Sequence, residues 1–103
     1  MLDIKLTNQE NVQVLALIGE LDIATVDKFK SAVEAAKVPD KTIELDMSQL
    51  EFVDSTGVGG LLKAIKGLQG DQIPVQLTNI SPEVFEVFDL LGLPLLLGQE
   101  VFR

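Results

Sequence analysis

The hydrophobic residues of this chain switch repeatedly between two spacings, and this switching restricts the fold more than any other feature of the sequence. Apolar residues at every second position, as in Leu2, Ile4 and Leu6, predict a strand. Apolar residues at intervals of three and four, as from Val26 to Ala36, predict a helix. The expected strands are residues 2–7, 12–18, 42–47 and 75–77, and the expected helices are about 24–37, Thr56 to Gly70 and Pro82 to Gly92.

The order of these elements, β-β-α-β-α-β-α, predicts an α/β fold with a mixed sheet, in which a hairpin is followed by parallel strands joined through helices. Strands 43–47 and 75–77 are apolar on one face only, so we expect the helices to lie mainly on one face of the sheet. Only the second strand indicates apolar surface on both sides. After Pro94, the short run Leu95-Leu96-Leu97 predicts a final strand or a packed tail.

Length and composition exclude several classes of protein. A chain of 103 residues without a linker or repeat predicts a single domain, residues 1–103. The sequence contains no cysteine and no histidine, which removes disulfides, the usual zinc sites and imidazole bases. A net charge of −8 disfavours nucleic acid and anionic membranes as partners. With no signal peptide or membrane span in the pattern, we expect a cytoplasmic protein.

The segment Asp54-Ser55-Thr56-Gly57-Val58-Gly59-Gly60 carries the candidate chemistry, because three glycines stand where the second helix should begin. Glycine inside a helix costs up to about 1 kcal/mol relative to alanine, which indicates that the backbone stays uncovered there. In one interpretation Ser55 is a helix N-cap and the glycines allow close packing. In the other, Ser55 receives a phosphoryl group, which free N–H groups and the helix dipole would tolerate. The spacing leaves both open.

Other motifs are weaker. The glycines match neither a dinucleotide-binding fingerprint nor a P-loop. Asp22, Asp46 and Asp54 lie near the ends of predicted elements, where solvated caps are more common than metal sites. We therefore expect no cofactor and no metal.

Four ordered motifs resemble the STAS domain family, and within it the bacterial anti-sigma factor antagonists. The resemblance runs from about residue 2 to residue 97. The motifs are Gly19-Glu20-Leu21-Asp22, Leu45-Asp46-Met47-Ser48, Phe52-Val53-Asp54-Ser55-Thr56-Gly57-Val58-Gly59, and Asn79-Ile80-Ser81-Pro82 before Phe88 and Gly92-Leu93.

The resemblance implies partner switching. An unphosphorylated antagonist binds an anti-sigma factor that is also a serine kinase, and phosphorylation of the serine after the aspartate, here Ser55, ends binding. A serine phosphatase would restore the active form. The implied docking surface consists of Glu20 and Asp22, expected in the loop after the second strand, with Asp54, Thr56, Gly57 and Gly59. In this interpretation the chain is a kinase substrate and not an enzyme.

Three alternatives remain at this point. The chain could be a STAS subunit held permanently in a transport or stress-sensing complex, a domain that binds a small ligand or nucleotide, or an enzyme, for which Ser55 lacks a nearby base. The family usually continues into a C-terminal helix that this sequence does not show. Apolar surface near Leu95 to Leu97 would then have less cover, which suggests a homodimer or a partner there.

Overall fold

The computed structural model describes residues 1–102, so Arg103, the last residue of the predicted domain, lies outside the described residues. The predicted order of strands and helices is confirmed. The elements are β1 (Leu2–Asn8), β2 (Val12–Leu21), α1 (Val26–Ala36), β3 (Thr42–Val53), α2 (Ser55–Gly70), β4 (Val75–Thr78), α3 (Pro82–Leu90), α4 (Leu93–Leu97) and the 3-10 turn η1 (Gln99–Val101).

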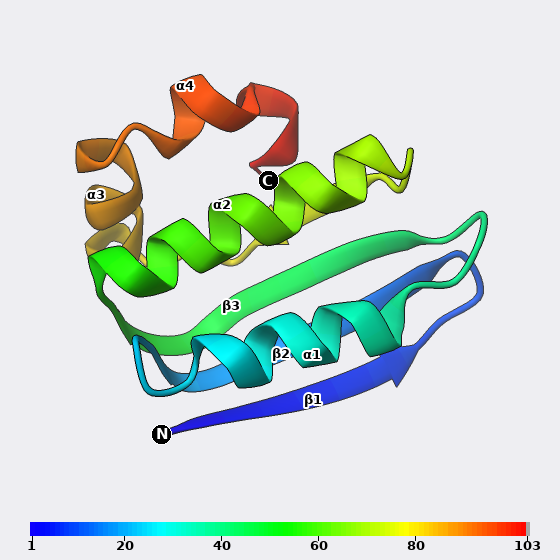
Figure 1. Cartoon of the computed structure of the whole chain (residues 1–103), viewed down its shortest axis with the longest axis horizontal. Helices are drawn as coiled ribbons and strands as arrows, with labels where there is room; N and C mark the ends of the chain where they lie inside the picture. Colours follow the sequence, from blue (N-terminus) through cyan, green and yellow to red (C-terminus); the bar gives the residue numbers. More distant parts are fainter. Residues whose placement is uncertain (103) are drawn as a thin grey trace.

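The four strands form one mixed sheet in the order β1-β2-β3-β4. β1 and β2 pair antiparallel as a hairpin, whereas β2 with β3 and β3 with β4 pair parallel. Figure 1 shows α1 and α2 side by side over the same face of this sheet, so the predicted arrangement of helices mainly on one face is confirmed. Because β2 and β3 are parallel neighbours, their carboxyl ends meet at one edge of the sheet.

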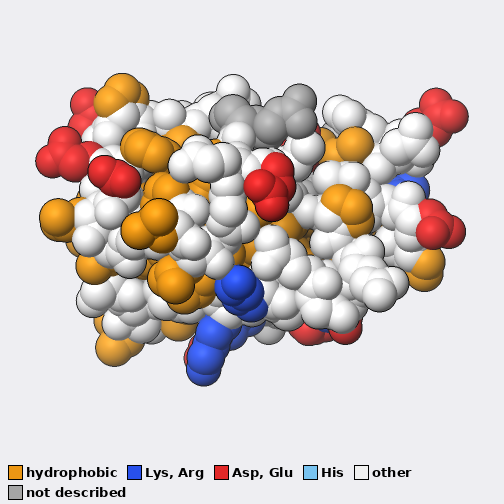
Figure 2. Space-filling model, turned by 90° about the horizontal axis from the view of Figure 1, so that it is seen from above, with side chains coloured by type: hydrophobic (Ala, Val, Ile, Leu, Met, Phe, Trp, Pro, Cys, Tyr) orange, Lys and Arg blue, Asp and Glu red, His pale blue; other side chains and the backbone are white. Residues whose placement is uncertain are grey.

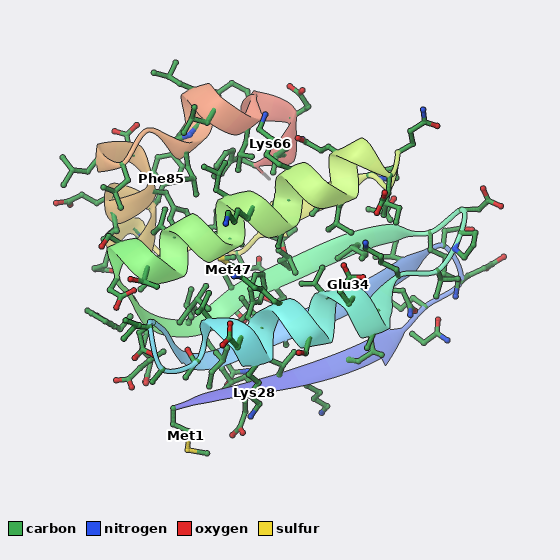
Figure 3. All side chains as sticks on the ribbon, in the orientation of Figure 1. Met1, Lys28, Glu34, Met47, Lys66 and Phe85 are labelled. Carbon is green, nitrogen blue, oxygen red and sulfur yellow. The ribbon has the colours of Figure 1, made fainter. Side chains whose placement is uncertain are left out.

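The core lies between that face and the helices. Phe29 of α1 and Phe88 of α3 are fully buried, and Met47 of β3 is buried between the sheet and the helices (Figure 3). α1 and α2 bury the stripes that their spacing predicted, including Val33 on α1 and Leu61 on α2. No helix within residues 1–102 has both the length and the apolar character needed to cross a membrane.

The C-terminal ends of two strands lie beyond the ends that were predicted. β2 continues to Leu21 and β3 to Val53, so both strands are longer than the alternation indicated. The register between them shifts near Ile18 and again near Glu20, and such an irregularity interrupts the two-residue pattern.

The run Leu95-Leu96-Leu97 belongs to the short helix α4 and is not a strand. Gly92, with φ of 80°, turns the chain between α3 and α4 in a conformation that glycine adopts readily. Leu97 packs into the core, whereas Leu95 and Leu96 are exposed.

Candidate functional site

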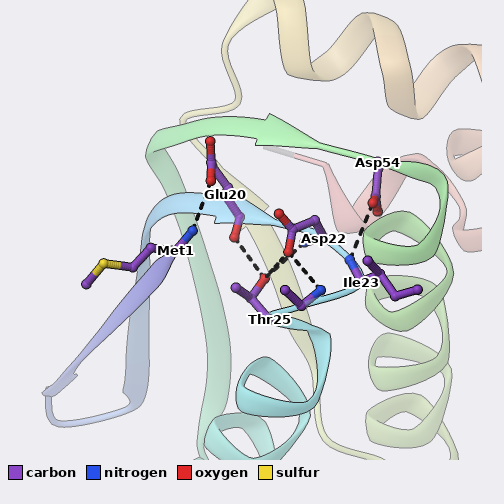
Figure 4. A network of polar contacts seen from close by, with 7 residues as sticks. Met1, Glu20, Asp22, Ile23, Thr25 and Asp54 are labelled. Atoms are coloured by element: carbon purple, nitrogen blue, oxygen red, sulfur yellow. Dashed lines mark hydrogen bonds and ion pairs between the residues drawn. The ribbon is translucent and has the colours of Figure 1, made fainter.

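The candidate site forms where β2 and β3 end side by side. Leu21 and Val53 are paired across the two strands, and the next residues, Asp22 and Asp54, lead into α1 and α2. The chain thus leaves the sheet at two adjacent points and starts a helix from each. Figure 4 shows the polar contacts that join these two starts.

Asp54, and not Ser55, is the N-cap of α2, so the prediction that Ser55 caps the helix is wrong. The Asp54 Oδ1 accepts a hydrogen bond of 2.7 Å from the Gly57 N–H, which is the usual capping contact three residues on. Its Oδ2 accepts a second bond of 3.3 Å from the Ile23 N–H in the loop before α1. One carboxylate therefore caps α2 and ties the two helix starts together.

The loop before α1 is held by its own side chains. The Asp22 Oδ1 accepts a hydrogen bond of 3.0 Å from the Ala24 N–H. The Thr25 Oγ1 lies 2.9 Å from the Glu20 carbonyl oxygen and 3.2 Å from the Asp22 Oδ1, and it accepts a bond from the Asp22 N–H. Thr25 is buried, and the sequence analysis missed it. Its position directly before the apolar helix pattern was the available signal, because threonine is favoured at helix starts.

Glu20 lies in β2, so the prediction that it shares a loop with Asp22 is wrong. Its exposed side chain points to the end of β1, where Oε1 lies 2.9 Å from the Met1 ammonium group. The hydrogen bond to Glu20 raises the pKa of this ammonium group. Glu20 therefore lies on β2, at the edge of the site.

The three glycines serve different purposes, and the prediction of a backbone left bare at all three is wrong. A Cβ at Gly57 would overlap the Leu21 carbonyl oxygen, and one at Gly60 would overlap the Val26 side chain. Both glycines are buried, so they allow α2 to pack closely on the end of β2 and on α1. A Cβ at Gly59 would meet nothing within 4 Å, so this glycine alone leaves open surface.

Ser55 and Thr56 are exposed as the first two residues of α2. Amides at these positions have no partner within the helix, and the amide that follows is taken by Asp54. Beside Thr56, a shallow hollow of about 310 Å³ is lined by Lys30 of α1 and Lys63 of α2. The sequence analysis did not assign these lysines to the site.

Two exposed apolar side chains flank the capping aspartate. Ile23, whose N–H binds Asp54, is 74% exposed, and Phe52 at the end of β3 is 51% exposed. Large apolar side chains beside polar groups are typical of the centre of a protein interface. The sequence analysis did not select Ile23, and it gave Phe52 only as part of a motif.

The three aspartates do not form a metal site. Asp22 and Asp54 bind backbone amides of the loop before α1, whereas Asp46 lies on β3 and accepts bonds from the Ser48 N–H and the Asn79 side chain. Partial burial by itself would raise the pKa of Asp46, but these hydrogen bonds outweigh it and lower the pKa below its ordinary value of 3.8. Among residues 1–102, no cluster of three or more acidic side chains could hold a metal ion.

The chain is similar to known proteins in sequence and in fold. The STAS domain model matches residues 3–103. The chain is 29% identical over 93 residues to the anti-sigma-B factor antagonist of Listeria monocytogenes, covering 89% of this chain and 81% of the relative.

Two solved structures share the fold. An anti-sigma factor antagonist from Mycobacterium paratuberculosis superposes with a TM-score of 0.82 at 21% identity, covering 95% of this chain and 84% of the other. The Bacillus cell fate determinant SpoIIAA in its phosphorylated form superposes with a TM-score of 0.70 at 26% identity, covering 98% and 89%.

Proposed function

Because this chain belongs to the STAS domain family, we propose that it is an anti-sigma factor antagonist controlled by phosphorylation of Ser55. Unphosphorylated, it binds an anti-sigma factor that is also a serine kinase, and phosphorylation releases it. The observation that carries the proposal is the exposed Ser55 hydroxyl at the first position of α2, directly after a capping aspartate. A serine phosphatase in the cytoplasm returns the protein to its binding form.

The position of Ser55 allows a phosphoryl group to be added without unfolding the domain. Ser55 is exposed, so the group enters solvent and displaces no core residue. The amides of the first turn and the positive end of the helix dipole favour an anion there. The capping bond is donated by the Gly57 N–H to Asp54 Oδ1 and does not use the Ser55 hydroxyl, so the cap remains intact.

The same phosphoryl group changes the docking surface strongly. It adds about −1.5 to −2 charges near neutral pH, beside the carboxylates of Asp54 and Asp22. A partner that contacts Ile23, Phe52 and the open surface at Gly59 then meets added bulk and negative charge at the centre of its interface. A loss of about 2.7 kcal/mol weakens binding roughly a hundredfold, which is sufficient for a switch.

The chemistry of phosphoryl transfer belongs to the kinase in this proposal. This chain supplies the acceptor hydroxyl and the acidic side chains around it, while the nucleotide and its metal ion are bound by the partner. With a net charge of −8, the protein acts on transcription through the anti-sigma factor and not by contacting DNA.

The direct test is to incubate the protein with a cognate anti-sigma kinase and ATP and to measure the intact mass. We expect the gain of one phosphoryl group, lost in Ser55→Ala and retained in the matched control Ser31→Ala, at an exposed serine of α1. No gain in mass, or an unchanged gain in Ser55→Ala, would contradict the proposal.

A second test separates charge from shape. Ser55→Asp and Ser55→Asn have similar size, but only the first adds a negative charge. We expect Ser55→Asp to weaken kinase binding at least about tenfold more than Ser55→Asn in a titration, because a charge at the centre of the interface must lose its water when the kinase docks. Equal binding by the two variants would remove charge as the basis of the switch.

A further inference from the structure

Four exposed leucines lie together on α3, α4 and the turn between them. Leu90 is 84% exposed, Leu91 42%, Leu95 91% and Leu96 50%. We call these residues the leucine face. Single exposed leucines are ordinary on protein surfaces, but a group on neighbouring elements is typical of an interaction site.

The leucine face is not needed to complete the core. α3 and α4 already bury Val84, Phe88, Leu93 and Leu97, which fill the inward positions of both helices. Leu90 and Leu95 are almost fully exposed, so these two side chains contribute little to the packing of the domain.

The charges around the leucine face are distributed unequally. Residues 82–101 contain four acidic residues and no lysine or arginine, and Glu86 lies one helical turn before Leu90. On the other side, Figure 3 shows Lys66 of α2 on the side of this helix that faces α4, whereas Lys63 lines the hollow beside α1. Figure 2 shows hydrophobic side chains gathered over one half of this face, with acidic side chains at its outer end and both basic and acidic side chains toward the middle.

We propose that the leucine face is the contact surface of a two-fold symmetric homodimer. A two-fold axis places each surface against itself in reverse orientation, so the leucines of one copy meet those of the other. The acidic residues of α3 in one copy, such as Glu86, then lie opposite Lys66 of its partner. This surface is therefore complementary to itself both in apolar character and in charge.

An anionic membrane fits the leucine face less well than a second copy of the chain does. An anionic membrane would be repelled by the acidic residues of α3. The net charge of −8 does not prevent self-association, because charges further apart than about 8 Å are largely screened at physiological salt. The proposal does not depend on Ser55, which lies at the start of α2.

The first experiment is analytical ultracentrifugation of the full chain across a concentration series. We expect a monomer–dimer equilibrium with a dissociation constant in the range of about 1–100 µM. The double variant Leu90→Gln with Leu95→Gln should weaken dimerisation at least about tenfold, since both side chains lose apolar burial. Leu6→Gln, at an exposed leucine of β1, is the matched control and should dimerise like the wild type.

The second experiment tests the orientation. Lys66→Glu and Glu86→Lys should each dimerise poorly, because each places like charges opposite one another. Mixing the two variants in equal amounts should restore a dimer, because each copy then supplies the charge that its partner lacks. Circular dichroism and urea unfolding establish that all the variants are folded.

Several results would overturn the proposal. The proposal is wrong if the protein remains monomeric at about 500 µM. It is also wrong if the leucine double variant dimerises as strongly as the wild type, or if the mixture of charge variants associates no more than either variant alone. Dimerisation weakened by Ser55→Asp but not by the leucine substitutions would place the contact at the start of α2 instead.

Discussion

Asp54 uses its two carboxylate oxygens for two different tasks. Oδ1 caps α2 through Gly57, and Oδ2 binds the Ile23 amide of the neighbouring helix start. Ser55 thereby becomes the first helical residue, with its hydroxyl free of any capping role. At the scale of single residues, Asp54 caps the helix while the neighbouring Ser55 does not, so a change at the serine hydroxyl leaves the helix cap in place.

We expect Asp54→Ala to lower the free energy of unfolding by about 1–2 kcal/mol, because both the cap and the tie to Ile23 are lost. Asp54→Asn should cost less, since its amide oxygen still caps Gly57 while its NH₂ group cannot accept a bond from Ile23. Urea unfolding of the three proteins measures both effects. An Asn variant as unstable as the Ala variant would show that the tie to Ile23 dominates.

The glycines of α2 offer a matched pair of substitutions. Gly57→Ala should destabilise the protein by about 1–3 kcal/mol, because its methyl group would overlap the Leu21 carbonyl oxygen. Gly59→Ala should stabilise it by about 0.5–1 kcal/mol, because the space is open and alanine is the better helix former. Thermal or urea unfolding compares them. A stable Gly57→Ala protein would contradict the close packing at this position.

Part of this site could be predicted from the sequence. The segment around Asp54 and Ser55, and its place between a strand and a helix, follow from glycine spacing and periodicity. The identity of the cap does not, because aspartate and serine are equally favoured at that position. Nor does the burial of Gly57, because it depends on how closely the end of β2 approaches α2.

At the scale of elements, the hydrophobic spacing predicted which segments form strands and helices but not where the longer strands end. β3 follows a two-residue alternation only as far as Met47, and its pairing with β2 then shifts register near Gln49. A shift of this kind arises from contact between two strands far apart in the sequence, so local periodicity cannot reveal it. A second shift, between Gly19 and Glu20, lies in the part of β2 beyond its predicted end.

The hydrogen bonds that Asp46 accepts, one from Ser48 within β3 and one from Asn79 after β4, predict that stability depends on pH in the acidic range. Because the folded pKa of Asp46 lies below its unfolded value, its ionised form stabilises the fold above about pH 4. This contribution is lost as the pH falls through the lower, folded pKa. Asp46→Asn should therefore reduce the loss of stability between neutral pH and about pH 3.

Urea unfolding at several pH values between these limits tests this expectation. Glu10→Gln, at an exposed acid in the β1–β2 turn, is the control, because it removes a carboxylate that forms no part of this network. An acid dependence that is the same for Asp46→Asn and the wild type would assign the effect to other carboxylates.

At the scale of the whole molecule, stabilising contacts are spread unevenly. β2 and β3 are paired on both sides and lie over the core, whereas α4 has five residues and exposes Leu95 and Leu96. The overall fold was predictable because the four strands and the helices α1, α2 and α3 each carry their own pattern. The surface formed by α3 and α4 was not, since it depends on how the turn at Gly92 places two short helices.

This uneven distribution predicts the pattern of hydrogen exchange. Amides of β2 and β3 should exchange only through global unfolding, while those of Leu96 in α4 and of its C-cap Gly98 should exchange through local opening at lower free energy. If the leucine face joins two copies, protection of the α4 amides should rise with protein concentration, because dimerisation must be reversed before α4 opens. Protection of β2 should rise by about the same factor, because global unfolding also requires the dimer to dissociate. Hydrogen exchange measured by NMR at two protein concentrations tests both the local opening of α4 and its dependence on concentration. If the α4 amides were as protected as those of β2 in dilute solution, local opening of α4 would be contradicted.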